Sequence, residues 1–249
     1  MPEAKREPMK TVSRADYLAV TFALVFPTII TVAYFILAAG YPAIIQQTTY
    51  SLGKLLQFTF PLVWVCAIQR HKPCWTKPAA NDLGLGTAFG LLVGAVIVGG
   101  YFFVLKPAGT LGVASAAMQE KLAGAGIEGV VPFVALGVFY SLGHALLEEY
   151  YWRWFTFGQL RRLAPLGVAI FVSSAGFMAH HVLVLAWYFG WFTLVTILFS
   201  LSVAVGGAVW AWMYQRSGSL WGVWLSHLLV DAAIFIVGYD LVFGASGAP

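Results

Sequence analysis

The stretch from Leu83 to Leu105, LGLGTAFGLLVGAVIVGGYFFVL, contains no charged side chain. An α-helix of about 20 apolar residues is long enough to cross the hydrocarbon core of a bilayer, which is about 30 Å thick. Lipid offers no hydrogen-bond partner to the backbone, so a segment of this kind crosses a membrane as a helix. The stretch therefore predicts a transmembrane helix and indicates the fold class of the whole chain.

Apolar runs of similar length recur along the 249 residues, of which 60% are hydrophobic and 10% charged, with a mean hydropathy of +0.82. A soluble domain has about 25% charged residues. The sequence predicts an all-α, polytopic integral membrane protein with about seven transmembrane helices. The predicted spans are residues 17–39, 43–68, 83–105, 129–151, 166–189, 192–214 and 219–243.

The loop over residues 106–128 is rich in Ala and Gly and allows an eighth, half-inserted segment, so the predicted count is seven to eight. No internal repeat, low-complexity tract or long linker divides the chain. We expect a single polytopic membrane domain over residues 1–249.

The basic residues predict the orientation, because cytoplasmic loops are enriched in Lys and Arg. With seven crossings, 11 of the 14 basic residues fall on one side. This places the amino terminus in the cytoplasm and the carboxyl terminus outside, and we expect the cell (plasma) membrane. A net charge of +4 needs no nucleic-acid partner. The 11 residues are Lys5, Arg6, Lys10, Arg14, Arg70, Lys72, Lys77, Arg153, Arg161, Arg162 and Arg216.

Few ionisable residues lie inside the predicted spans, and four of the five histidines are among them. Each such group costs a few kcal/mol to insert, so it usually faces a cavity and has a function. This concentration is the strongest functional signal in the chain. The residues are His144, Glu148, Glu149, His180, His181, His227 and Asp231, with Lys54 and Asp240 near span ends.

Helical spacing sorts these groups into faces. Glu149 and Arg153 are four residues apart and can pair, whereas Glu148 is rotated by about 100° and shares a face with His144. His227 and Asp231 repeat the spacing of four. Structural alternatives stay open: the glutamates can reach the interface, a histidine can bond between helices, and His227 can simply pair with Asp231.

The same groups suit the activation of water. A glutamate held away from bulk water can take a proton from a water molecule and later give it to a leaving amine. Two histidines and a carboxylate with an open position also form the usual ligand set of a hydrolytic zinc site. Glu148, His181, His227 and Asp231 fit either scheme.

Three motifs carry a resemblance to a known family. Glu148-Glu149-Tyr-Tyr-Trp-Arg153 resembles the Glu-Glu-x-x-x-Arg signature of the CAAX-protease and bacteriocin-processing (CPBP, or Abi) family of intramembrane proteases. Phe177-Met-Ala-His-His181 resembles its Phe-x-x-x-His motif, and His227-Leu-Leu-Val-Asp231 its His-x-x-x-Asn motif, with Asp in place of Asn. The match covers a catalytic core over residues 130–242.

The resemblance implies a role for each matching residue. Glu148 is the general base or acid, and His181 helps to hold or polarise the water. His227 and Asp231 bind the oxyanion or, with His181, hold Zn²⁺ or another divalent metal. A metal-free, glutamate-dependent mechanism is the alternative. Glu149 and Arg153 form a supporting pair, and Phe177 supports the second motif.

Three positions carry ambiguity. An ionised Asp231 has no proton to donate to an oxyanion, so it acts as a metal ligand, a protonated donor or an orienter of His227, which mildly favours the metal scheme. His180 neighbours His181, but the motif spacing selects His181. His144 has no assigned role.

The predicted function is that of an intramembrane metalloendopeptidase, with one chain as the catalytic unit and an active site that opens to the cytoplasmic side. Its partners are the bilayer and a membrane-associated protein or peptide, such as a lipidated, CAAX-like substrate. The oligomeric state is open. The rivals are a proton-coupled secondary transporter and a non-catalytic scaffold or immunity protein of the same fold.

Overall fold

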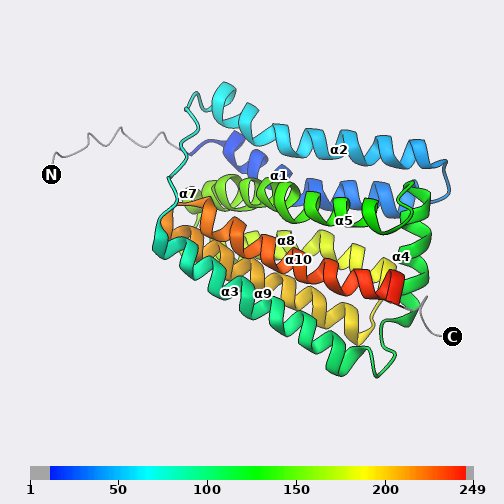
Figure 1. Cartoon of the computed structure of the whole chain (residues 1–249). Coiled ribbons are helices and arrows are strands. Elements are labelled where there is room, and N and C mark those ends of the chain that lie inside the picture. The colour runs from blue at the N-terminus through cyan, green and yellow to red at the C-terminus, as the bar shows by residue number, and fades with distance from the viewer. Residues whose placement is uncertain (1–11, 245–249) are drawn as a thin grey trace.

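The computed structural model describes residues 12–244. Within them, seven helices are long and apolar enough to cross a membrane, and no strand is present, which confirms the predicted all-α membrane fold. The helices run alternately up and down in one bundle (Figure 1). They extend over Arg14–Leu37, Ala43–Ile68, Ala80–Leu105, Val130–Leu163, Leu166–Phe189, Leu194–Ser217 and Leu220–Phe243.

The first three helices each consist of an α-helix that ends in a π-helical turn of five residues. The α-helical parts are α1 (Arg14–Val32), α2 (Ala43–Val63) and α3 (Ala80–Gly100). The last three are continuous: α8 (Leu166–Phe189), α9 (Leu194–Ser217) and α10 (Leu220–Phe243).

The fourth helix is longer than predicted and is interrupted by two π-helical segments. It comprises α5 (Val130–Phe139), a π-helical turn (Tyr140–His144), α6 (Ala145–Glu149), a second π-helical segment (Tyr150–Phe157) and α7 (Gly158–Leu163). π-Helical segments inside α-helices are rare and frequently mark functional sites.

The predicted end of this helix at residue 151 is wrong. Tyr151 and Phe155 are fully buried, and Trp152 is nearly so. Because these aromatic side chains lie inside the bundle rather than at its surface, the helix continues past them to Leu163. Arg153, which we placed in the following loop, is therefore inside the helix, and Glu148 is close to the middle of it.

The loop over residues 106–128 contains α4 (Gly112–Gly124), which lies across one end of the bundle (Figure 1). At about 1.5 Å per residue, this helix is about 20 Å long and is too short to span a bilayer. The Ser115 hydroxyl donates to the Leu241 carbonyl oxygen at 2.6 Å, and Gln119 Nε2 donates to that of Val242 at 2.9 Å. The segment thus covers the end of α10 and adds no eighth spanning helix.

Small residues let α3 approach α10 closely. A methyl group added at Gly90 would come within 2.9 Å of the Leu229 side chain, and one at Gly94 within 3.4 Å of Ala233. Gly90 and Gly94 therefore act as a small-residue helix-packing motif. This close contact fixes α10, which carries two of the candidate site residues.

Polar side chains join three helices at the end of the bundle where α1 begins. Gln69 Nε2 donates to Asp16 Oδ1 at 3.2 Å and to Gln159 Oε1 at 2.9 Å. Arg162 Nη1 donates to the same Gln159 oxygen at 2.7 Å and lies 3.7 Å from Asp16 Oδ1. Since Arg161, which precedes Arg162, and Arg14, at the start of α1, lie at this end too, we call it the basic end.

Candidate active site

The ionisable residues predicted from the sequence converge inside the bundle. Glu148 and Glu149 come from α6, His180 from α8 and His227 from α10, and all four are buried. Helices that are far apart in sequence therefore build one polar cluster, which sequence spacing alone could not show.

Glu148 faces three imidazole rings. Its Oε1 atom lies 3.9 Å from His144 Nε2 and 3.8 Å from His180 Nε2, and its Oε2 atom lies 3.8 Å from His227 Nε2. A direct hydrogen bond to a carboxylate measures about 2.7 to 3.2 Å. The Glu148 carboxylate is thus surrounded by imidazole nitrogens, and each of them lies beyond the distance of a direct hydrogen bond.

Glu149 is in the opposite situation. Its Oε2 atom lies 3.1 Å from Arg153 Nε, so the predicted ion pair is present, and its Oε1 atom accepts a hydrogen bond from His227 Nδ1 at 2.7 Å. The Arg153 guanidinium also lies over the rings of Phe177, at 4.7 Å, and Trp210, at 5.1 Å. Both oxygens of Glu149 are engaged, which gives this residue a structural role.

His227 is oriented by these contacts. A carboxylate can only accept, so Nδ1 carries the proton in the bond to Glu149, and Nε2 points toward Glu148 and Asp231. The distance from His227 Nε2 to Asp231 Oδ1 is 3.5 Å. The ring also stacks on Trp210, with centroids 4.3 Å apart. The His227 and Asp231 motif residues are therefore neighbours, as their spacing predicted.

The two adjacent histidines of α8 have different environments. His181 Nδ1 donates to the Phe177 carbonyl oxygen at 2.8 Å, which leaves Nε2 as the free nitrogen of a neutral ring. His180 stacks parallel to Trp152 and turns its Nε2 atom toward Glu148. Their rings are 4.2 Å apart. The motif spacing selects His181, whereas the histidine placed beside Glu148 is His180.

The residues do not form a metal site as they are arranged. His181 and His227 each donate Nδ1 to a fixed acceptor, as metal-binding histidines commonly do. However, no group of three His, Cys, Asp or Glu side chains within residues 12–244 could hold an ion, and this includes the predicted set with Asp231. Metal dependence stays a prediction.

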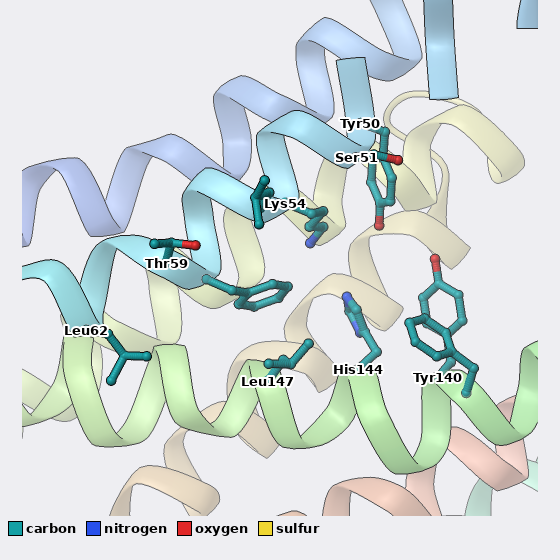
Figure 2. A pocket seen from close by; sticks show the side chains of 11 residues that line it. Tyr50, Ser51, Lys54, Thr59, Leu62, Tyr140, His144 and Leu147 are labelled. Atoms are coloured by element: carbon teal, nitrogen blue, oxygen red, sulfur yellow. The ribbon is translucent and has the colours of Figure 1, made fainter. Parts of the chain in front are cut away.

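A cavity of about 490 Å³ lies between α2 and the fourth helix, with His144 in its wall (Figure 2). Its other polar residues include Tyr50 and Lys54 from α2 and Tyr140 from the π-helical turn. His144 belongs both to this cavity and to the surroundings of Glu148, so it connects the cavity with the carboxylate.

A second cavity of about 390 Å³ continues from the first, since Phe58, Leu62 and Leu147 line both. It extends to Cys74 and Trp75 in the loop after α2. The two cavities together form a path from His144 toward the basic end of the bundle.

Sequence reasoning missed several residues around the cluster. Tyr140 precedes His144 by four residues, as His144 precedes Glu148, so helical spacing could have indicated it. No spacing signal could have indicated Trp210, because it comes from α9, a helix to which we assigned no role. Lys54 was noted only as a residue near a span end.

One comparison with known proteins identifies the region that holds this cluster. A family model described as "Type II CAAX prenyl endopeptidase Rce1-like" matches residues 130–233. This region is similar to the Rce1-like family. The Rce1-like match contains all three motifs and confirms the resemblance drawn from them. No curated protein and no solved structure matches the chain.

The family and the seven apolar helices together identify an integral membrane protein that is, at the general level, a CAAX-type protease. Such a protease acts on a peptide at the membrane.

Proposed function

We propose that this Rce1-like protein is an intramembrane endopeptidase that hydrolyses a peptide bond of a lipidated, CAAX-like or other membrane-associated substrate. The observation that carries the proposal is the position of Glu148. It is a buried carboxylate whose imidazole neighbours in the described part of the chain lie at 3.8 to 3.9 Å, and one of them, His144, lines a cavity.

In the first step, Glu148 accepts a proton from a water molecule while the water oxygen attacks the carbonyl carbon of the scissile bond. General-base catalysis of this kind contributes about 10²-fold to 10⁴-fold in rate. His181 Nε2 is free to accept the second hydrogen of this water, because Nδ1 is occupied by the Phe177 carbonyl. This supports the role of His181 as the residue that orients the water.

The carbonyl oxygen becomes negatively charged in the tetrahedral intermediate. His227 points Nε2 into the same region as Glu148 and can donate to this oxygen when that nitrogen carries a proton. Glu149 and Asp231 compensate the charge of the protonated ring. Asp231 therefore acts as an orienter of His227, and Glu149 is a positioning residue.

In the last step, the carbon–nitrogen bond breaks and Glu148 gives its proton to the leaving amine. The carboxylate is then regenerated, so the cycle consumes one water molecule and needs no other reagent. His180 has no part in these transfers and holds the Glu148 side chain between its own ring and that of His144.

We further propose that the basic end faces the cytoplasm of the cell that carries the protein in its plasma membrane. The positive-inside rule supports this orientation. The two connected cavities support access from the same side, because the second one reaches the loop after α2.

The test uses the full chain, purified in detergent and returned to lipid nanodiscs. It is incubated with a fluorescent peptide that carries a farnesylated cysteine followed by three apolar residues. We expect a new product with cleavage after the lipidated cysteine, found by mass spectrometry. Cleavage of the peptide by wild type but not by Glu148→Gln supports the proposal. Equal cleavage by both proteins would remove Glu148 as the base.

Chelation tests the metal alternative in the same assay. The side chains of residues 12–244 form no ligand set for an ion as they are arranged, so treatment with 1,10-phenanthroline should leave the cleavage rate unchanged. A loss of activity that added Zn²⁺ restores would show that the ligands rearrange around a metal.

A further inference from the structure

We propose that Lys54 binds the free carboxylate at the carboxyl terminus of the substrate peptide, and so restricts cleavage to bonds close to a chain end. This inference rests on the proposed function and names a specificity determinant for it.

Lys54 lies inside a membrane-spanning helix, α2, and its side chain enters the cavity. The ammonium group lies 5.5 Å from the centroid of the Tyr50 ring and 5.4 Å from that of Phe58. Figure 2 shows it directed from α2 toward His144 on the facing wall. The cation is thus presented to the cavity that adjoins Glu148.

Lys54 has no carboxylate within ion-pair distance among the residues that the structure describes. Lys106, at the far end of the bundle, is different, because its ammonium lies 2.6 Å from Asp240 Oδ2. A charged side chain inside the membrane costs a few kcal/mol and usually marks a functional site. An anionic ligand would supply a counter-ion within ion-pair distance.

A CAAX peptide carries its free carboxylate at a short, fixed distance from the scissile bond. A CAAX motif ends the chain, so its carboxylate lies three residues beyond the lipidated cysteine. Three extended residues span about 10 Å. With the scissile bond at Glu148, the peptide end would extend past His144 into the cavity, where Lys54 is the cation that lines it.

The rest of the lining suits such an occupant. Apolar side chains, among them Leu55, Leu62 and Phe139, form most of the wall and can accept apolar residues of the peptide. The hydroxyl groups of Tyr50 and Tyr140 point toward each other (Figure 2) and are hydrogen-bonded, which leaves one of the two to donate to the same carboxylate. The volume of about 490 Å³ lies in the usual range for small-ligand pockets.

The test compares two farnesylated peptides that are identical except at the carboxyl terminus, which is a free acid in one and an amide in the other. Their kcat/KM values are measured with wild type, Lys54→Met, Lys54→Arg and Lys106→Met. Lys106→Met is the matched control, because it also removes a lysine but one that is already paired. Melting curves establish that each variant is folded, and Lys54→Gln replaces Lys54→Met if the latter does not fold.

We expect wild type to prefer the acid at least ten-fold, mainly through a lower KM. This preference should persist in Lys54→Arg and Lys106→Met and fall to near one in Lys54→Met. A wild-type ratio near one, or an unchanged ratio in Lys54→Met, would overturn the assignment while the proposed protease function stands.

A binding experiment separates the two claims if no cleavage is seen. Fluorescence anisotropy measures the affinity of both peptides for Glu148→Gln and for Glu148→Gln combined with Lys54→Met. A preference for the acid that Lys54→Met removes supports the carboxylate site even where the protease assay fails. Equal affinity for the two peptides would contradict it. Competition by inorganic phosphate, with no acid preference among the peptides, would assign Lys54 to a phosphate group instead.

Discussion

Glu148 and Glu149 are neighbours in sequence, yet they lie in opposite environments. Glu149 accepts a hydrogen bond from His227 through one oxygen and forms an ion pair with Arg153 through the other, and it is completely buried. Glu148 faces imidazole nitrogens at 3.8 to 3.9 Å and adjoins a cavity. One carboxylate is fully paired, whereas the other is surrounded by polar groups and left available.

The difference separates two ways in which a membrane protein uses a buried charge. A carboxylate that contacts a charged or donor group through both oxygens fixes geometry, since neither oxygen is left for a substrate. A carboxylate without a direct partner is costly to keep, so it is expected to react or to bind a ligand. The following experiments test whether the two glutamates really divide in this way.

The largest effect is expected at Glu148. Glu148→Gln keeps the size of the side chain but removes the proton acceptor, so cleavage should fall by about 10³-fold or more. The melting temperature should be nearly unchanged, because the wild-type carboxylate has no direct bond to lose. The measurement pairs a peptide-cleavage assay with a melting curve. A variant that cleaves normally, or one that fails to fold, would contradict the assignment of Glu148 to catalysis rather than to structure.

The second effect concerns stability and tests the other glutamate. Glu149→Gln and Arg153→Met each leave a buried charge without its partner, which costs about 3 kcal/mol or more. We expect a clearly lower melting temperature in detergent for both.

Arg162→Met is the control for this change. Arg162 is also near a carboxylate, 3.7 Å from Asp16, but its side chain is 34% exposed. An exposed pair is worth less than about 1 kcal/mol, so the melting temperature should hardly move. Equal shifts in melting temperature in all three variants would show that the buried Glu149 pair contributes no more to stability than the exposed pair.

The third comparison separates the two histidines of α8. His181→Asn should lower kcat by about 10²-fold, because it removes the nitrogen that orients the water. His180→Asn should lower kcat by about ten-fold, since His180 only contacts the side of Glu148. Initial rates at saturating peptide provide the readout. The reverse order would transfer the water-orienting role to His180, the ring nearer to Glu148 in the structure.

The smallest effect is expected for Asp231→Asn. Asn keeps an oxygen that can accept from His227 and adds an amide that can donate to the oxyanion. Activity should remain within about ten-fold of wild type, whereas Asp231→Leu should lose more. An Asp231→Asn variant as inactive as Asp231→Leu would show that the negative charge itself is needed, as a metal ligand would require.

Composition and spacing predicted much of this molecule. Apolar runs of membrane length are a local property of the chain, and all seven helices are present. The pairing of Glu149 with Arg153 follows from a spacing of four on one helix and was also predicted correctly. Both features depend only on residues that are close in sequence.

The features that the sequence did not predict depend on contacts between distant segments. The fourth helix extends beyond residue 151 because Trp152 and Phe155 pack against other helices, which no local pattern reveals. The bond between Glu149 and His227 joins residues 78 apart. The position of Lys54 in the cavity depends likewise on how α2 lies against the fourth helix.

The most direct test of the central claim, that Glu148 makes this protein a protease, is a comparison of new protein termini in membranes. Cells express either wild type or Glu148→Gln at matched levels, and both proteins are shown to be folded. We predict termini that occur only with wild type, which would establish proteolysis and identify its substrates together. Identical sets of termini in the two samples would contradict the account.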